Sequence, residues 1–333
     1  MAELLRVEDL RTWYHTPAGV IRAVDGVSLS LEQGQTLGLV GESGSGKSVT
    51  ALSIMRLIDP PGRIEPDSRI VFQGIDLATA SEDELQELRG NQVAMIFQEP
   101  MTSLNPVYPI GPQVAEPLRL HRTMRSRAAQ ARAIELLRQV GIPLPERRAR
   151  EYPHQLSGGM RQRVMIAMAM ACDPVLLIAD EPTTALDVTI QAQILALMRD
   201  LRRRRNTAIL LITHDLGVIA EMADDVAVMY AGRIVEQGPV DKVFASPQHP
   251  YTEALLHSLP LLGMTQAEPL NVIRGMVPSP LRWPSGCRFA PRCDYAFDKC
   301  VTYPPLMDVG GQAAACWLCE GGLRSTVGQK THA

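Results

Sequence analysis

Short runs of apolar residues recur along the chain, and most of them end on a glycine or a polar residue. We interpret five of these runs as strands, at 36–40, 93–97, 175–179, 208–213 and 226–230. Continuous apolar runs of this kind are typical of strands buried on both faces of a parallel sheet. Ligands bind such sheets at the carboxyl ends of their strands. The pattern therefore predicts an α/β fold with its chemistry along one edge of the sheet.

Helical periodicity dominates the segment between the second and third predicted strands. One helix is predicted from an N-cap at Ser126, with apolar positions of 133–140 on one face and a stop at Gly141. A second is predicted over 158–172, ended by the Asp-Pro pair that follows. We expect residues 99–173 to form a helical subdomain inserted into the sheet.

Composition narrows the class of protein. The chain has 333 residues, 46% of them hydrophobic and 21% charged, with a formal net charge of -3. This balance lacks the basic excess of a dedicated nucleic-acid binder, so we expect no nucleic-acid partner. The N-terminal residues are partly acidic and lack a long apolar stretch, and no other apolar run is long enough to span a bilayer. We expect a cytosolic protein without a membrane span.

The cysteines are distributed unevenly. Cys172 lies in an apolar helical stretch and is expected to be a small core residue. The other five crowd the C-terminal end of the chain, at Cys287, Cys293, Cys300, Cys316 and Cys319. In a reducing cytosol such clustering indicates metal or redox chemistry more than structural disulfides. Prolines also become frequent there, so we divide the chain into a domain at 1–240 and a C-terminal extension at 241–333.

A glycine-rich loop follows the first predicted strand. Residues 41–48 read GESGSGKS and match the pattern G-x-x-x-x-G-K-[ST] between a strand and a helix. Glycines let backbone N–H groups point at a phosphate, and the next helix presents its positive end to the same anion. Lys47 would reach the β- and γ-phosphates, and Ser48 would ligate Mg²⁺. The predicted nucleotide-binding residues of this loop are Gly41, Ser43, Gly44, Ser45, Gly46, Lys47, Ser48 and Val49.

Polar residues also follow three other predicted strands. Asp180 and Glu181 come directly after the strand at 175–179. Asp180 suits a second-sphere position at Mg²⁺, and Glu181 is placed to polarise an attacking water. Gln98 and His214 end two further strands and should lie along the same edge. Polar residues at strand ends are commonly only exposed to solvent. The phosphate loop nearby favours a catalytic role for these.

The decisive segment is 156–162, which reads LSGGMRQ. By itself it is a helix start with Ser157 as the cap. Together with the preceding motifs it resembles the signature loop of ATP-binding cassette (ABC) ATPases, and the resemblance covers about residues 4–240. The one departure is Met160, where the family more usually has glutamine. It leaves the phosphate-facing Ser157 and Gly159 unchanged.

The resemblance implies a fold and a role for each matched residue. The fold is a P-loop NTPase (RecA-like) core with an inserted helical subdomain and a small N-terminal antiparallel β subdomain. The matched residues are Tyr14 against adenine, Gln98 in the Q-loop, Ser157, Gly158 and Gly159 in the signature, Asp180 and Glu181 in Walker B, 185–187 in the D-loop and His214 as the switch histidine. Glu181, His214 and Gln98 would be catalytic. Ser48, Gln98 and Asp180 would hold Mg²⁺.

The family also implies a working dimer. Two such domains pack head to tail, so that the phosphate loop of one faces the signature loop of the other. Ser157 and the adjacent helix N-terminus would complete the shell around the γ-phosphate of a partner's ATP. ATP would close the dimer, and hydrolysis would let it reopen.

Two further segments point to a branch of the family. Residues 98–106 read QEPMTSLNP and extend the Q-loop into the region that touches the membrane subunit in this family. Residues 246–252 read SPQHPYT and are similar to the C-terminal region of dipeptide, oligopeptide and nickel importer ATPases. This implies ATP-driven peptide import, with nickel or another solute as the alternative. The implied partners are a second, F-type ATPase subunit, two membrane permease subunits and a solute-binding protein, at the cytoplasmic face of the inner membrane.

In that branch, the C-terminal cysteine pattern is similar to one that holds a [4Fe–4S] cluster. Cys287, Cys293, Cys300 and Cys316 are spaced C-x5-C-x6-C-x15-C. Four thiolates suit either a cubane cluster or Zn²⁺, and this spacing separates the two poorly. The resemblance favours iron–sulfur, with zinc as the second possibility.

The same motifs bear on three other classes of protein. Soluble ABC ATPases of DNA repair separate their Walker motifs by long coiled coils, whereas a compact helical segment lies between Ser48 and Asp180 here. Translation-associated members carry two cassettes in a chain. A non-enzymatic metal-binding regulator would leave the ATPase motifs unexplained. The arginines at 202–205 are interpreted as a solvated helix face.

Overall fold

The computed structural model describes residues 3–98, 103–184, 187–258 and 273–322. Its centre is an eight-stranded sheet in the order β12-β13-β11-β10-β3-β9-β8-β7. The strands are β3 (Thr36–Val40), β7 (Val93–Ile96), β8 (Leu176–Asp180), β9 (Ala208–Ile212), β10 (Asp225–Tyr230), β11 (Arg233–Pro239), β12 (Met307–Asp308) and β13 (Ala313–Ala314). From β10 to β7 all pairings are parallel. All five predicted strands are therefore confirmed, to within a residue or so at each end.

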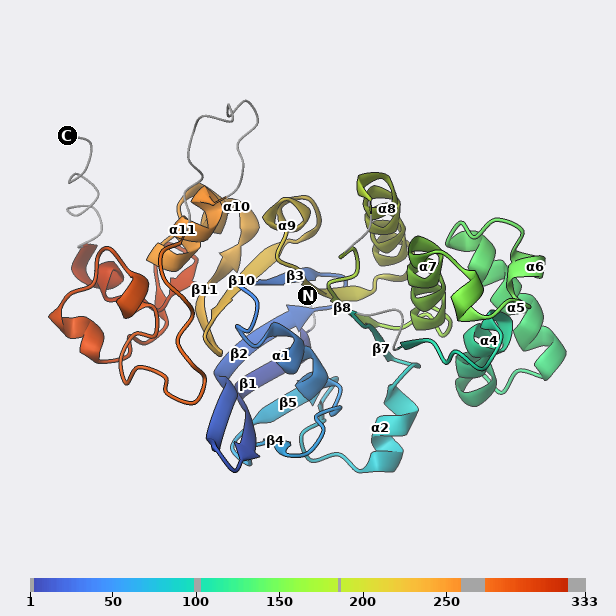
Figure 1. The fold of residues 1–333 in the computed structure, drawn as a ribbon, viewed down its shortest axis with the longest axis horizontal. Coiled ribbons are helices and arrows are strands. Elements are labelled where there is room, and N and C mark those ends of the chain that lie inside the picture. Colours follow the sequence, from blue (N-terminus) through green and yellow to red (C-terminus); the bar gives the residue numbers. More distant parts are fainter. Residues whose placement is uncertain (1–2, 99–102, 185–186, 259–272, 323–333) are drawn as a thin grey trace.

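A second, antiparallel sheet lies beside the first (Figure 1). Its strand order is β2-β1-β5-β6, and β4 pairs with β1. The strands are β1 (Glu3–Thr16), β2 (Gly19–Glu32), β4 (Gly62–Ile64), β5 (Arg69–Phe72) and β6 (Ile75–Asp76). Helices α1 (Lys47–Ile54) and α2 (Glu82–Leu88) belong to the same part of the chain. The alternating burial of β1 and β2 is typical of strands with one face on the core and the other toward solvent.

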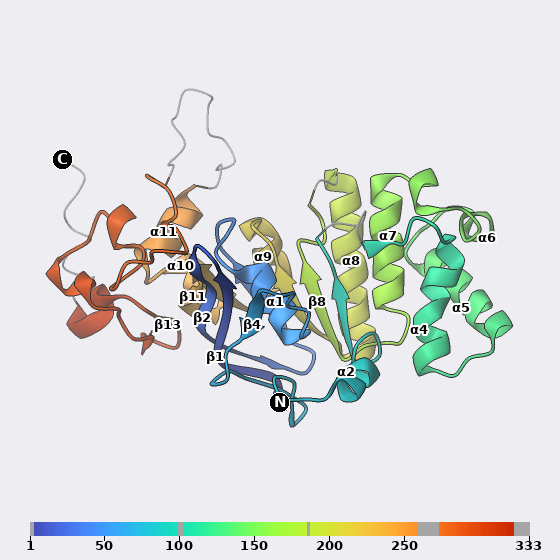
Figure 2. The same ribbon diagram turned by 60° about the horizontal axis from the view of Figure 1, so that its bottom comes forward.

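Among the described residues between β7 and β8, helices α4 to α7 group at one end of the molecule (Figures 1 and 2). They are α4 (Ile110–His121), α5 (Ser126–Gln139), α6 (Pro145–Arg148) and α7 (Gly158–Ala169). The expected cap at Ser126 is wrong: Ser126 is the first helical residue, and Arg125 precedes it without a side-chain cap. Helix α7 ends earlier than predicted, because the chain turns at 170–173 and Asp173 adopts a positive φ of 49°.

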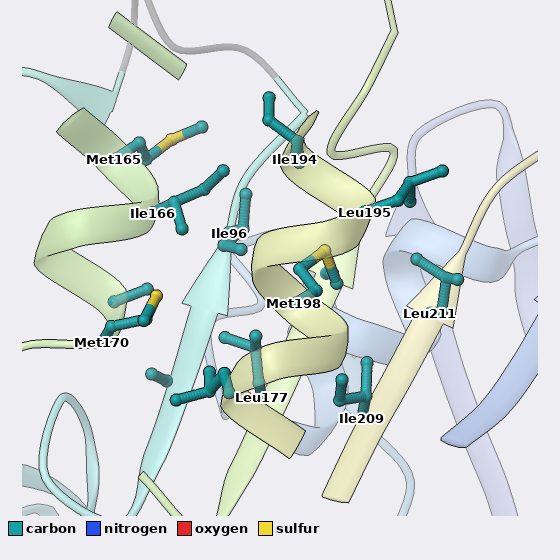
Figure 3. Packing of buried hydrophobic residues seen from close by; sticks show 14 of the residues in the cluster. Ile96, Met165, Ile166, Met170, Leu177, Ile194, Leu195, Met198, Ile209 and Leu211 are labelled. Atoms are coloured by element: carbon teal, nitrogen blue, oxygen red, sulfur yellow. The ribbon is translucent and has the colours of Figure 1, made fainter. Parts of the chain in front are cut away.

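Both faces of the central sheet are buried. Leu177, Ile209 and Leu211 point into one apolar cluster, whereas Ile178 and Leu210 point into the other. Successive side chains of a strand point to opposite faces, so this division follows directly from the pleat. Figure 3 shows side chains of α7 and α8 (Val188–Arg205) meeting those of the strands in the first cluster. This core holds the strand ends, and the polar residues that follow them, in fixed positions.

The segment after β11 lies at the end of the molecule opposite α4–α7 (Figures 1 and 2). Its helices α10 (Val240–Ala245) and α11 (Pro250–His257) follow α9 (Leu216–Met222) along the chain. Strand β13 pairs antiparallel with β11, and β12 pairs with β13. The C-terminal segment therefore adds two strands to the central sheet, which the sequence pattern did not predict. Among the described helices, none is long and apolar enough to cross a membrane.

Candidate nucleotide-binding site

The glycine-rich loop connects β3 to α1, as the sequence predicted. Gly46 precedes α1 with a φ of 108°, in the left-handed region that side chains rarely adopt. A Cβ at Gly46 would lie 2.4 Å from the carbonyl oxygen of Ala23, and one at Gly41 would lie 2.1 Å from that of Met229. The loop is therefore wedged between β2 and β10, where only glycine fits at these two positions.

Lys47 is buried and folds back over the loop. Its Nζ donates to the carbonyl oxygens of Gly41 and Glu42, at 2.8 and 3.1 Å. Burial lowers the pKa of the Lys47 ammonium, while the carboxylates of Glu181 and Asp180 act in the opposite direction. The ammonium group is thus held at the phosphate loop in a setting poor in water, where its attraction for a phosphate is strong.

Ser48 and Asp180 meet at the other side of the loop. The Ser48 hydroxyl donates to Asp180 Oδ1 at 3.2 Å, and Asp180 is only 3% exposed at the end of β8. Burial raises the pKa of Asp180, partly offset by the hydrogen bond from Ser48 and the charge of Lys47. A hydroxyl and a carboxylate oxygen are hard donors of the kind that Mg²⁺ prefers, so the pair fits the expected metal.

Glu181 is the centre of a second polar cluster. Its φ is 48°, and its N–H donates to the carbonyl of Ile212 on β9 at 2.8 Å. Gln98 Nε2 donates to Glu181 Oε2 at 3.1 Å, and His214 Nδ1 lies 3.4 Å from Oε1. Three residues predicted to be catalytic, from the ends of β7, β8 and β9, are therefore brought together. Gln98 is joined to Glu181 here, and its expected role as a Mg²⁺ ligand stays a prediction.

Thr184 joins the same cluster, and the sequence reasoning missed it. Its hydroxyl donates to Glu181 Oε2 at 2.8 Å. Although burial raises the pKa of Glu181, the hydrogen bonds from Thr184 and His214 outweigh it and hold that pKa below the ordinary value. Glu181 is therefore a carboxylate at neutral pH and can accept a proton. The position of Thr184 shortly after two acidic residues was the only sequence signal for it, and that arrangement is too common to predict a role.

The signature segment opens α7 with its tip toward open space. Ser157 is the N-cap and accepts from the N–H of Met160 at 3.4 Å. No heavy atom lies within 4 Å of a Cβ placed on Gly158, whereas Gly159 is partly buried. Buried Gln162 donates to the carbonyl oxygen of Pro182 at 2.6 Å. The start of α7 is thus tied to the segment that follows Glu181.

Tyr14 and the expected D-loop complete the predicted set. Tyr14 pairs with Gly62 across the β1–β4 ladder, and a Cβ on Gly62 would come within 2.6 Å of the Tyr14 ring. Burial raises the pKa of the Tyr14 phenol, with a further contribution from Asp59. Residues 185 and 186 of the expected D-loop lie outside the described residues. Asp187 caps α8 by accepting from the N–H of Ile190 at 2.9 Å.

Four of the C-terminal cysteines gather around one small cavity of about 20 Å³. Its lining includes Cys287, Cys293, Cys300 and Cys316. Cys319 is not among the lining residues, and its Sγ lies 3.8 Å from the carbonyl oxygen of Gln248. Four thiols are a suitable donor set for Fe–S or Zn²⁺. Across the described ranges, however, no group of three or more His, Cys, Asp or Glu side chains is arranged to hold a metal ion.

Burial opposes ionisation of two of these thiols. Burial raises the pKa of Cys287 to about 11 and that of Cys293 to about 12. A bound metal would reverse this preference, because a coordinating thiol is deprotonated. The four cysteines thus offer suitable donor atoms, but the described side chains are not arranged as a metal site.

Comparison with known proteins adds two family matches. Residues 24–184 match the family model described as ABC transporter. Residues 235–300 match the model described as oligopeptide/dipeptide transporter, C-terminal region. The chain is also similar to the oligopeptide transport ATP-binding protein AppD of Bacillus subtilis. The two are 54% identical over 322 residues, which cover 96% of this chain and 98% of AppD.

Two solved structures are similar in fold. One is the dimeric, post-hydrolysis structure of the ATP-binding cassette MJ0796 bound to ADP and Pi. It has a TM-score of 0.65 and 28% sequence identity, covering 71% of this chain and 99% of that one. The other is cbiO1 from Clostridium perfringens, part of the ABC transporter complex cbiONQ. It has a TM-score of 0.61 and 26% identity, covering 74% of this chain and 92% of that one.

Proposed function

This chain belongs to the ATP-binding proteins of ABC transporters and is an ATPase, and we propose that it powers the import of dipeptides or oligopeptides. Two observations support the proposal: the polar cluster around Glu181 beside the phosphate loop, and the match of residues 235–300 to a peptide transporter C-terminal region. The relationship to AppD, at 54% identity, points to the same solute class.

The proposed hydrolysis uses groups that the fold holds at one edge of the sheet. The loop amides and Lys47 bind the phosphates. Ser48 and Asp180 would hold Mg²⁺, which would neutralise phosphate charge. Glu181, ionised and held by Gln98, Thr184 and His214, orients the attacking water and accepts its proton. Tyr14 would stack on the adenine.

We further propose that the working unit contains a second ATPase subunit, an F-type relative of this chain. The open space around Gly158 supports this, because a partner's ATP could approach the N-terminus of α7 there. The related cassette MJ0796 is dimeric in its solved structure. Ser157, Gly158 and Gly159 would bind the γ-phosphate of the nucleotide held by that partner.

The remaining proposed partners are two membrane permease subunits and a solute-binding protein that acts through them. Apolar side chains after the Q-loop support a membrane-subunit contact, since Val107 is 71% exposed and Tyr108 is 57% exposed. The chain would then be a peripheral protein at the cytoplasmic face of the membrane. We keep the division into 1–240, with the helical subdomain at 99–173, and 241–333 as part of this proposal.

For the C-terminal cysteines we propose a [4Fe–4S] cluster, with Zn²⁺ as the alternative. The gathering of four thiols around one cavity supports a metal, and family resemblance favours iron. Cys287, Cys293, Cys300 and Cys316 would be the ligands. Iron and acid-labile sulfide should be measured after anaerobic purification. One equivalent of zinc without iron would favour the alternative, and Cys300→Ser should lower the metal content in either case.

Peptide import can be tested with the assembled transporter in vesicles. The unaltered complex should take up a labelled dipeptide or tripeptide only with Mg²⁺ and ATP inside, and Glu181→Gln should abolish uptake. Glu221→Gln, an exposed change on α9, is the matched control. Uptake of nickel ions but not of peptides would contradict the proposed solute. A complex that hydrolyses no ATP would contradict the proposed activity as well.

A further inference from the structure

The C-terminal segment touches the phosphate loop at Glu42, directly after Gly41. The Tyr251 hydroxyl of α11 accepts a hydrogen bond from the Glu42 N–H at 2.8 Å. The Arg292 guanidinium binds both oxygens of the Glu42 carboxylate, at 2.7 and 3.0 Å. One residue of the nucleotide site is therefore held, at its backbone and its side chain, by a part of the chain more than 200 residues away.

Arg292 is also held in position by contacts other than those with Glu42. Its side chain is only 5% exposed. Its Nε donates to the carbonyl oxygen of Arg274 at 2.9 Å, and one Nη contacts the Tyr230 hydroxyl at 3.3 Å. A two-pronged arginine–carboxylate pair of this kind fixes direction as well as charge. The pair is too buried and too constrained to resemble the exposed ion pairs that contribute little.

Tyr251 is also held by its surroundings. It is fully buried, and its ring lies 4.6 Å from the ring of Tyr230 and 5.4 Å from that of Phe289. The rings thus form an aromatic cluster between the C-terminal segment and β10. The hydroxyl has little freedom to move away from the Glu42 N–H.

Glu42 in turn contacts the phosphate-binding lysine. Its carbonyl oxygen accepts from Lys47 Nζ at 3.1 Å, and its charge is among those that act on Lys47. An unpaired carboxylate at this position would repel an incoming triphosphate and compete with it for Lys47. Arg292 neutralises that carboxylate by pairing with both of its oxygens.

We propose that Tyr251 and Arg292 are positioning residues of the nucleotide site, which fix Glu42 and cancel its charge so that the loop binds ATP. The C-terminal segment is then a structural part of phosphate binding. This inference rests on the proposed ATP site at 41–48. The nucleotide site is then complete only when Tyr251 and Arg292, which lie far outside the motif, contact Glu42.

The test measures the affinity of the purified full-length chain for a fluorescent ATP analogue in the presence of Mg²⁺. Arg292→Gln should weaken binding about tenfold, the typical effect of leaving a partly buried charge without its partner. Arg292→Lys keeps the charge but loses the second contact, so it should weaken binding less. Tyr251→Phe removes only the hydroxyl acceptor and should weaken binding about threefold to tenfold.

A second substitution separates charge from folding. Glu42→Gln combined with Arg292→Gln removes the unpaired carboxylate, and it should regain most of the affinity that Arg292→Gln alone has lost. The defect of Arg292→Gln, relative to the unaltered chain, should also shrink in high salt. A merely structural role would give neither result. Arg138→Gln breaks the pairs of Arg138 with Glu135 on α5 and Glu146 on α6, far from the loop in sequence, and is the control.

The outcomes are distinguishable. Unaltered affinity in both Arg292→Gln and Tyr251→Phe would overturn this inference and leave the proposed ATPase intact. An Arg292→Gln defect that Glu42→Gln does not relieve would overturn the charge argument. No binding by the unaltered chain would instead overturn the proposed function itself. Thermal melting of each variant shows that the comparison is made between folded proteins.

Discussion

The Ser48 hydroxyl donates a hydrogen bond to Asp180 Oδ1 at 3.2 Å across a sequence separation of 132 residues. This contact joins the end of the phosphate loop to the end of β8. It places a hydroxyl and a carboxylate beside the phosphate loop, where both could bind a hard metal ion that also contacts a phosphate. The two residues therefore act together, and a substitution at either should lower the affinity for Mg²⁺.

Asp180→Asn should raise the Mg²⁺ concentration needed for half-maximal ATP hydrolysis. Loss of an outer-sphere carboxylate typically weakens metal binding about 10–100-fold. Titration of the steady-state rate with Mg²⁺ at saturating ATP measures this shift. The exposed change Asp200→Asn on α8 is the control. An unchanged Mg²⁺ requirement in Asp180→Asn would remove Asp180 from the metal site.

The same substitution should stabilise the Mg²⁺-free protein at neutral pH. Burial raises the pKa of Asp180, so the folded chain holds this proton more tightly than the unfolded chain does. The resulting stabilisation is present below the unfolded pKa and is lost as pH rises through the folded pKa. At neutral pH ionisation of Asp180 carries this cost of burial, so Asp180→Asn, which has no charge to bury, should melt at a higher temperature. A lower Tm at that pH would contradict this reading of the burial.

Glu181→Gln should lower the turnover number about 10²–10⁴-fold, the usual contribution of a general base. ATP binding should remain close to normal, because Glu181 lies beyond the phosphate loop. Single-turnover hydrolysis and equilibrium nucleotide binding separate the two effects. Near-normal turnover in this variant would mean that another group accepts the proton.

Thr184→Ala should shift the acid limb of the pH–rate profile toward higher pH. The Thr184 hydroxyl donates to Glu181 and helps to hold its pKa down, against the effect of burial. Without it the pKa of Glu181 rises, and the active carboxylate is lost at a higher pH on acidification. The kcat profile, measured from neutral pH down to below the ordinary glutamate pKa of 4.5, shows the shift. Thr184→Ser, which keeps the hydroxyl, should leave the acid limb in place.

Met198→Ala should destabilise the fold by about 2–5 kcal/mol, the usual cost of truncating a fully buried side chain. Met198 is fully buried on α8 among residues of the strands below it (Figure 3). Urea unfolding of the nucleotide-free chain measures the change. Thr189→Ala, at an exposed position of the same helix, should stay within about 0.5 kcal/mol. Equal losses in both variants would mean that helix propensity, not packing, sets the cost.

The central sheet could be predicted from the sequence because its strands are buried on both faces. Val93–Ile96 and Ala208–Ile212 are fully buried, and such strands read as continuous apolar runs. Gln98, Glu181 and His214 could be grouped for the same reason, since they follow neighbouring parallel strands. Features that depend on residues close together in sequence, or on neighbouring strands, could therefore be predicted from the sequence.

What escaped prediction depends on contacts between distant parts of the chain. No sequence motif links Tyr251 or Arg292 to Glu42. The three residues come into contact only in the folded chain. The two-residue strand β13 has no apolar periodicity of its own, so its pairing with β11 could not be foreseen. Helix boundaries failed for a simpler reason: Ser126 has the chemistry of a cap but lies one position inside the helix.

The pairing of β13 with β11 has a consequence for dissecting this protein. Cutting the chain after residue 240, where the resemblance to the ABC ATPase domain ends, would remove Ala313–Ala314 from the edge of the sheet and expose the main-chain groups of β11. Exposed strand edges invite pairing with other molecules. An isolated motor fragment should consequently be sticky and prone to precipitate, so that its poor behaviour would say little about the loops that bind ATP.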